Sequence, residues 1–213
     1  MKPSTCLSAL VLAAGFVAAT PAVAAPADTP MAAVPAAPKL DAALRALWHG
    51  HVVHARDYAL AVHAHDPAKA RAAADAVVAN ARQIAGAVGG FYGKPAGARM
   101  LDLLAGHWAG LKAMTDARAA DDAAAERKAM ADLQANAGQI ASFLAAANPN
   151  LPENALQGML AVHVAHHATE VQQIMTGDRK GEQSTWAAIQ AHMDMLSDAL
   201  AAAIAKQFPA KAA

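Results

Sequence analysis

The chain has 213 residues, of which 56% are hydrophobic, and its 17 basic and 17 acidic residues leave no net charge at neutral pH. The sequence contains no block of basic residues, which argues against nucleic acid or an anionic membrane surface as a partner. Alanine is the dominant residue and β-branched residues are few, which favours helix throughout the chain. The composition therefore predicts an all-α protein.

The first 25 residues are expected to be a signal peptide. Lys2 provides the positive start, residues 7–19 form an apolar stretch, and small residues before and at Ala24-Ala25 suit cleavage. The apolar stretch is shorter than the about 20 residues that a membrane span requires, and we expect no membrane span. We therefore expect a periplasmic or secreted protein. The one cysteine, Cys6, precedes the apolar stretch, so a metal site in the mature chain would have to use His, carboxylate, Met or amide ligands.

Three further segments follow the signal peptide. Residues 26–39 are rich in Ala and Pro and almost uncharged, as expected of a disordered leader. Residues 40–209 are expected to form one helical domain, and a length of about 170 residues is enough to bury a sizeable core. Residues 210–213 would be a short tail. Nothing in the sequence identifies a protein partner, and either a monomer or a small oligomer fits.

Six helices are expected in the domain, because apolar residues recur at spacings of three and four. Asp41 is a plausible first N-cap, and the Asp66-Pro67 pair separates the first two helices. Residues 89–95 are predicted to be a turn, because they include three glycines and a proline. The predicted ranges are 41–64, 67–88, 96–117, from Asp121-Asp122 to a stop at 148–152, 153–176, and 182–207, with the last connection lying between Gly177 and Gly181.

A repeat of 56 residues runs through these helices. A histidine returns at His51, His107 and His163, and a second polar residue follows each of them after 29 residues, at Asn80, Asn136 and His192. This register indicates three tandem helical hairpins, and their short connections make successive helices antiparallel. Three hairpins could stack as an open row or close into a six-helix bundle with approximate three-fold symmetry. We favour the closed bundle, because three units are few for a solenoid and no polar cap is evident at either end.

The repeated histidines support two hypotheses. In a closed bundle the rings of His51, His107 and His163 would converge, and three neutral imidazoles with an open position can hold zinc or copper. Alternatively, each histidine would be hydrogen-bonded to the polar residue on the second helix of its own hairpin, Asn80, Asn136 or His192, and these pairs would fix the register without a metal. The second hypothesis describes a non-enzymatic structural or partner-binding bundle.

The third repeat carries additional ionisable residues. His163, His167 and Glu170 are spaced i, i+4 and i+7 on one helical face, whereas the positions that match His167 are Ala55 and Leu111. These three residues are the best candidates for metal ligands, with His51, His107 and His192 to complete the set. Leaving such groups buried and unpaired would cost several kcal/mol, and an ion pair between Arg56 and Glu170 is the non-metal way to compensate. A metal-dependent hydrolase with Glu170 as general base is a further alternative.

Several phrases resemble a group of small bacterial helical proteins commonly labelled "acetylglutamate kinase": Leu47-Trp48-x-x-His51-x-x-x-x-Arg56, Leu103-Leu104-x-x-His107, Asn148-Pro149-Asn150, Met159-Leu160-x-x-His163 with Glu170, and Gln207-Phe208-Pro209. The resemblance covers about residues 40–209 and implies a single helical domain of that extent. The group usually has threonine where this chain has Ala55. The sequence has no Gly-rich phosphate loop and no alternating strand–helix pattern, so we expect neither a nucleotide cofactor nor kinase activity.

Overall fold

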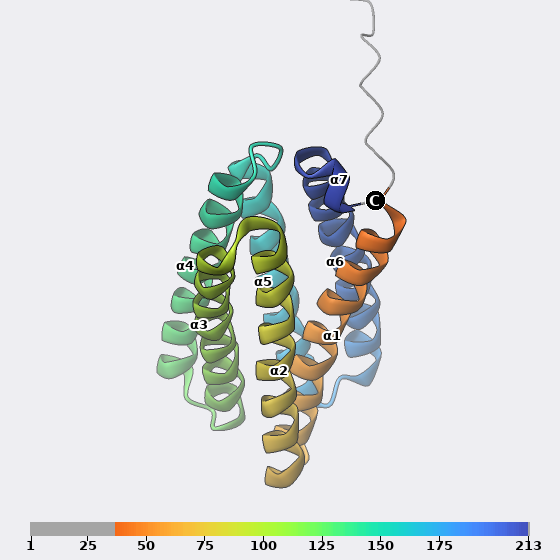
Figure 1. Ribbon diagram of the computed structural model, residues 1–213. Helices are drawn as coiled ribbons and strands as arrows, with labels where there is room; N and C mark the ends of the chain where they lie inside the picture. Colours follow the sequence, from red (N-terminus) through yellow and green to blue (C-terminus); the bar gives the residue numbers. More distant parts are fainter. Residues whose placement is uncertain (1–36, 213) are drawn as a thin grey trace, which may run out of the picture. The chain divides into compact units, whose positions relative to one another are not determined.

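The computed structural model describes residues 37–212, and the described residues are helical with short connections (Figure 1). The predicted all-α class is confirmed. The helices are α1 (Pro38–His63), α2 (Pro67–Tyr92), α3 (Lys94–Ala119), α4 (Ala123–Ala147), α5 (Glu153–Thr176), α6 (Arg179–Gln207) and the short α7 (Pro209–Ala212). The expected signal peptide and most of the expected leader lie outside the described residues.

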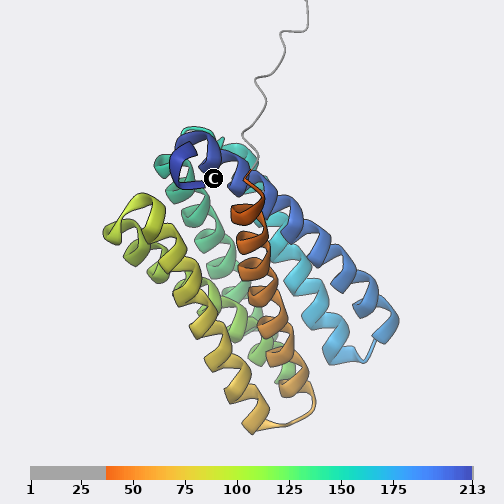
Figure 2. The same cartoon turned by 45° about the vertical axis from the view of Figure 1, so that its right-hand side comes forward.

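The six long helices form two concentric sets. Helices α1, α3 and α5 each contact the other two, whereas α2 packs on α1 and α3, α4 on α3 and α5, and α6 on α5 and α1. The contact between α6 and α1 closes the ring, and the two helices lie side by side in Figure 2. The helices therefore form the closed bundle, since an open row would keep the first and last hairpins apart. The repeat itself remains an interpretation of the sequence.

The starts of α1 and α6 each lie three residues before the predicted positions. Helix α1 begins at Pro38, with Ala37 rather than Asp41 as its N-cap, because proline is well suited to the first helical turn. Asp41 lies in that first turn, where its carboxylate interacts favourably with the helix dipole, and residues 38–39 belong to the helix rather than to a leader. Helix α6 begins at Arg179, because the Asp178 side chain accepts a hydrogen bond from the backbone N–H of Gly181 and caps the helix three residues earlier than predicted.

The predicted turn over residues 89–95 is wrong except at Gly93. Helix α2 continues through Gly89 and Gly90 to Tyr92, and only Gly93 leaves the helical region, with φ of 93°. A glycine inside a helix costs only about 1 kcal/mol, which packing against α3 can offset. Helix α3 then starts at Lys94 with a proline in its first turn. At the C-terminus, the expected tail residues 210–212 belong to α7, where Ala212 is buried.

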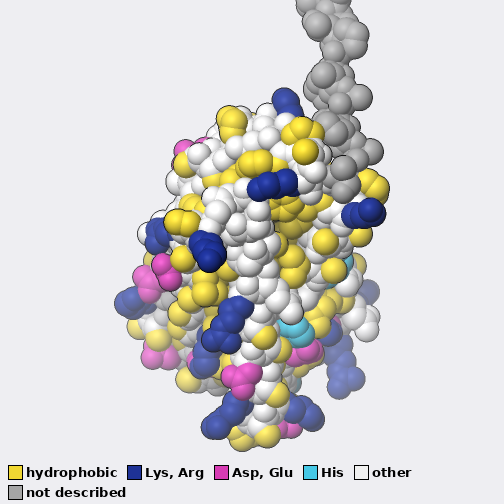
Figure 3. Space-filling view, in the orientation of Figure 1, with side chains coloured by type: hydrophobic (Ala, Val, Ile, Leu, Met, Phe, Trp, Pro, Cys, Tyr) yellow, Lys and Arg dark blue, Asp and Glu magenta, His cyan; other side chains and the backbone are white. Residues whose placement is uncertain are grey.

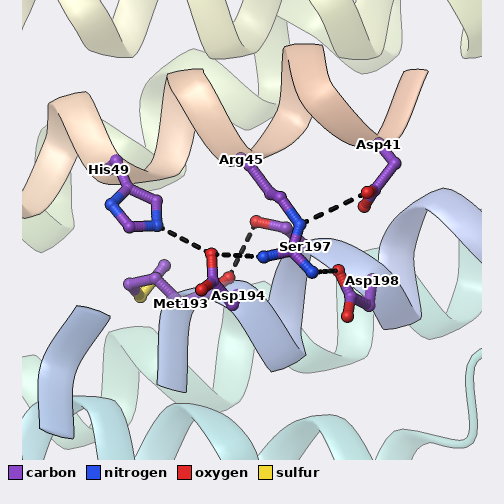
Figure 4. Close-up of polar contacts among 7 residues, drawn as sticks. All are labelled: Asp41, Arg45, His49, Met193, Asp194, Ser197 and Asp198. Atoms are coloured by element: carbon purple, nitrogen blue, oxygen red, sulfur yellow. Dashed lines mark hydrogen bonds and ion pairs between the residues drawn. The ribbon is translucent and has the colours of Figure 1, made fainter. Parts of the chain in front are cut away.

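A polar network spans the seam between α1 and α6 (Figure 4). The Arg45 guanidinium contacts Asp194 at 2.7 Å and Asp198 at 2.6 Å, and His49 Nε2 lies 2.8 Å from the same Asp194 carboxylate. Ion pairs this exposed contribute about 0–1 kcal/mol each. The closure therefore depends mainly on the apolar core beneath them, to which α1 contributes Leu44, Trp48 and Val52 and α6 contributes Met193, Leu196 and Leu200.

The surface carries charges of both signs. Figure 3 shows lysine and arginine side chains interspersed with aspartate, glutamate and apolar side chains over the visible face. This mixture agrees with the absence of net charge in the whole sequence. Among the described residues, no helix has an apolar stretch long enough to cross a bilayer.

Candidate metal centre

The three repeated histidines meet on the bundle axis. His51 of α1, His107 of α3 and His163 of α5 are each 3% exposed. Their ring centroids lie 5.8 Å apart for His51 and His107, 5.7 Å for His51 and His163, and 5.6 Å for His107 and His163. The expected convergence of these imidazoles is therefore present, and it follows from placing one histidine at the same level on each inner helix.

A fourth buried histidine adjoins this group. His167 lies one turn after His163 on α5, with ring centroids 4.4 Å apart, and its ring is 6.0 Å from that of His51. One nitrogen of each of His51, His163 and His167 lies within 4.8 Å of the other two. Zinc binds imidazole nitrogen at about 2.0–2.1 Å. Shifts of less than about 1 Å per ring would bring all three nitrogens to that distance from one ion.

Several ring nitrogens in the cluster lack hydrogen-bond partners. Within residues 37–212, Nε2 of His107, Nδ1 of His163 and Nε2 of His167 are buried and contact no donor or acceptor at hydrogen-bond distance. A buried polar atom left unpaired costs about 1–3 kcal/mol. Three such atoms therefore lie in one small buried region without a hydrogen bond to any of residues 37–212.

Asn136 determines the tautomer of His107. The Asn136 amide donates from Nδ2 to the carbonyl oxygen of Leu103 at 3.0 Å, so the amide oxygen must face His107, whose Nδ1 is 3.2 Å away. His107 Nδ1 therefore carries the proton and donates a hydrogen bond to Asn136 Oδ1. The other nitrogen, Nε2, is left with a free lone pair, as in metal-bound histidines whose second nitrogen is held by a hydrogen bond.

The predicted hydrogen bond between histidine and asparagine is formed in the second hairpin, but the contact common to all three hairpins is a different one. Asn80, Asn136 and His192 each approach the backbone carbonyl four residues before the repeated histidine, which belongs to Leu47, Leu103 and Met159 respectively, at 2.9, 3.0 and 2.9 Å. Because a carbonyl can only accept, His192 Nε2 is the donor in the third contact. His192 Nε2 is therefore occupied by this carbonyl, and the ring centroid of His192 lies 6.3 Å from that of His163. The predicted ligand role of His192 gains no support from this arrangement.

Two glycines make room for the asparagines, and sequence analysis missed them. A Cβ atom on Gly50 or Gly106 would lie 2.9 Å from Nδ2 of Asn80 or Asn136 respectively. The third hairpin has Val162 at the matching position, and there the asparagine is replaced by His192. The sequence shows that glycine and asparagine are replaced together by valine and histidine. Only the structure shows why, because the reason is the close approach of the two helices of each hairpin.

Glu170 links the histidine cluster to charged residues nearer the surface. Its side chain is 1% exposed, with Oε2 3.8 Å from His167 Nδ1 and Oε1 3.7 Å from Arg56 Nε. The predicted ion pair between Arg56 and Glu170 is therefore present, but Arg56 donates its short hydrogen bond, at 2.6 Å, to Glu182. That bond raises the pKa of Arg56. Sequence analysis had Glu182 only as the first residue of the last helix and missed its contact with Arg56, which joins positions 126 residues apart.

Burial keeps His51, His107 and His163 neutral by lowering their pKa values. Desolvation lowers the pKa of His107 to about 4, and the neighbouring His167 adds to the shift. Desolvation, followed by repulsion from neighbouring imidazoles, also lowers the pKa values of His51 and His163 well below 6.5. These three rings therefore carry free lone pairs at neutral pH, as metal coordination by histidine requires.

Comparison with known proteins found no matching family model, no matching curated protein and no matching solved structure. The resemblance to the group labelled "acetylglutamate kinase" therefore stays an observation on sequence motifs. A function for this chain has to be inferred from the chemistry of the buried histidine cluster and its surroundings.

Proposed function

We propose that the protein binds one transition-metal ion, copper or zinc, in the core of the bundle. His51, His163 and His167 would be the ligands, with His107 and Glu170 as adjoining donors. The observation that carries the proposal is the approach of one nitrogen from each of the three histidines to within 4.8 Å of the others in a buried site. A bound cation would pair nitrogens that otherwise have no partner, which offsets the cost of burying them.

The donor set fits copper and zinc better than calcium or magnesium. Imidazole nitrogen is a borderline ligand that suits zinc and copper, whereas calcium and magnesium prefer oxygen donors. Three histidines leave at least one position on a four-coordinate ion for Glu170, His107 or a water molecule. Export through residues 1–25 would place this site in the periplasm, where the ion would be acquired.

A non-metal function is the second candidate, and the hydrogen bond between His107 and Asn136 is the observation that favours it. In that case the histidines would only fix the packing of the inner helices, and the protein would serve as a structural or partner-binding bundle. The two candidates differ in whether a metal ion raises the melting temperature. An ion that binds only the folded state stabilises it, whereas the structural bundle would melt at the same temperature with and without metal.

Metal loading of the purified protein tests the proposal. The chelator-treated wild type would be titrated with Zn²⁺ and Cu²⁺, and bound metal measured after gel filtration. We expect one ion per chain, and at least about a 100-fold weaker affinity in the double variant His163→Ala, His167→Ala, since two ligands are lost. The exposed variant His65→Ala is the control and should bind as the wild type does.

The single variant His167→Leu guards against misfolding, because it introduces the residue that the second hairpin carries at position 111. Circular dichroism would establish that each variant is folded. Equal metal content in the wild type and in folded variants lacking the core histidines would overturn the proposal, as would a wild type that binds no ion.

A further inference from the structure

A pocket of about 290 Å³ lies between α1, α5 and α6, on the side of the bundle where Arg56 and Glu182 form their hydrogen bond. Most of its lining residues have polar or charged side chains, among them Arg56, His63, Gln173, Arg179 and Glu182. Arg56 contacts both the pocket and the buried Glu170 carboxylate. Its guanidinium lines the pocket, and its Nε lies 3.7 Å from Glu170 Oε1. The pocket is therefore separated from Glu170 by one side chain.

Three side chains of α5 that carry nitrogen or oxygen donors follow one another along the helix from the pocket to the histidine cluster. His167, Glu170 and Gln173 are spaced three residues apart, so they lie on successive turns of one helix. Gln173 lines the pocket, and its Oε1 is buried without a hydrogen-bond partner among residues 37–212, as is Oε1 of Glu170. Glu170 Oε2 in turn lies 3.8 Å from His167 Nδ1. Gln173 at the pocket, Glu170, and His167 in the cluster thus carry successive donor atoms along α5, and Glu170 Oε1 also lies 3.7 Å from Arg56 Nε.

We propose that this line of donors is the route by which a metal ion moves between the pocket and the histidine cluster. Glu170 is the intermediate ligand on the route, and the Arg56–Glu182 ion pair closes it. The inference rests on the proposed metal binding. A hydrated cation that loses water needs replacement oxygen donors, and Gln173 and Glu170 provide them in sequence.

Arg56 controls this route by its charge. The guanidinium is protonated at every accessible pH and lies directly beside Glu170, so it repels a cation that approaches the carboxylate. Its hydrogen bond to Glu182 and its position 5.0 Å over the Trp186 ring keep it in place. Because Arg56 is partly exposed at the pocket, its side chain can turn outward when an ion passes, without moving any helix.

The rates of metal uptake and release test the route. Stopped-flow mixing of Zn²⁺ with the full-length apoprotein would measure uptake, and an excess of chelator would measure release. We expect Arg56→Gln to accelerate both rates about tenfold, because the repulsion at the closure is removed, while the dissociation constant changes by less than about threefold. Gln173→Leu removes a donor and should slow both rates about tenfold.

Arg45→Gln is the matched control, because Arg45 also lies on α1 and pairs with acidic residues of α6, Asp194 and Asp198. It should leave both rates unchanged. A wild type that binds no Zn²⁺ would defeat the proposed function itself. Normal binding with unchanged rates in Arg56→Gln and Gln173→Leu would overturn the route alone. Equal acceleration by Arg45→Gln and Arg56→Gln would also overturn it, because a general loosening of the α1–α6 seam would then be responsible.

Discussion

Asn80 and Asn136 occupy matching positions on α2 and α4, but they make different numbers of hydrogen bonds. Both donate to a carbonyl of the preceding helix, and Asn136 also accepts from His107. Within residues 37–212, Oδ1 of Asn80 has no partner. We therefore expect Asn136→Ala to lower the free energy of unfolding by about 1 kcal/mol more than Asn80→Ala, because it also leaves the buried His107 Nδ1 unpaired. Urea unfolding of the two variants measures the difference.

The comparison between these two variants is internally controlled. Both replace a helical asparagine with alanine, so the change in helix propensity is the same and cancels. Equal losses of stability in Asn80→Ala and Asn136→Ala would show that the hydrogen bond between Asn136 and His107 contributes nothing to the free energy of unfolding.

For single residues, the sequence predicted part of the buried histidine cluster. The period of 56 residues placed His51, His107 and His163 at one level, and helical spacing added His167 and Glu170 to the same face. Which ring nitrogens remain free could not be predicted, because that depends on where amide groups of neighbouring helices point. Glu182 was missed for a related reason, since its contact with Arg56 joins positions 126 residues apart.

Between elements, two backbones approach each other closely where α2 meets α3. A Cβ atom on Gly97 would lie 2.8 Å from the carbonyl oxygen of Ala85 and 3.0 Å from Cα of Gly89. Neither atom can move without shifting a helix. We therefore expect Gly97→Ala to destabilise the protein by about 2 kcal/mol, within the range for overpacked sites, as measured by thermal or urea unfolding.

Gly86→Ala is the matched control for this prediction. Gly86 also lies inside α2, and a Cβ there would meet no atom within 4 Å. It should gain up to about 1 kcal/mol, because alanine is the better helix former. If Gly97→Ala were as stable as Gly86→Ala, the tight contact between α2 and α3 would be refuted.

The helix ends show what local sequence can predict about elements. Proline and aspartate at Asp66-Pro67 and Asp122 marked real boundaries, because capping depends on neighbouring residues alone. The stretch at Gly89-Gly90 was taken for a turn, whereas the structure continues the helix through it. Gly89 serves the close contact with α3, since a Cβ there would lie 3.6 Å from Cα of Gly97. A contact of that kind has no signature in one segment of sequence.

For the whole molecule, the sequence favoured a closed ring of helices only because three repeats are few for a solenoid and no polar cap is evident at either end. The periodicity predicts three hairpins equally well for a row or a ring, and only contacts such as that between His49 and Asp194, which are 145 residues apart, distinguish the two. Closure has an energetic consequence, because it brings several imidazoles into one dry volume. The folded state can hold them only as neutral groups, which couples stability to pH.

The direction of this coupling follows from the lowered pKa values. His107 has a pKa of about 4 in the folded protein, against 6.5 when unperturbed, and those of His51 and His163 are also lowered. At a pH between about 4 and 6.5, His107 therefore binds a proton in the unfolded chain but not in the folded chain. The free energy of unfolding is therefore highest above about pH 6.5. It falls as the pH drops toward 4, by up to about 1.4 kcal/mol per pH unit for each histidine.

The apoprotein should therefore lose stability steeply in mild acid, and removing one buried imidazole should reduce the slope. Carboxylates titrate in the same range, so the informative quantity is the difference between variants. Urea unfolding in the presence of a chelator, between about pH 6 and 4.5, should give a slope lower by about 1.4 kcal/mol per pH unit in His107→Leu than in the wild type. His63→Gln, at an exposed position, should retain the wild-type slope. An unchanged slope in His107→Leu would mean that His107 is protonated in the folded state, and a protonated ring could not supply the lone pair required of it as a donor to the metal.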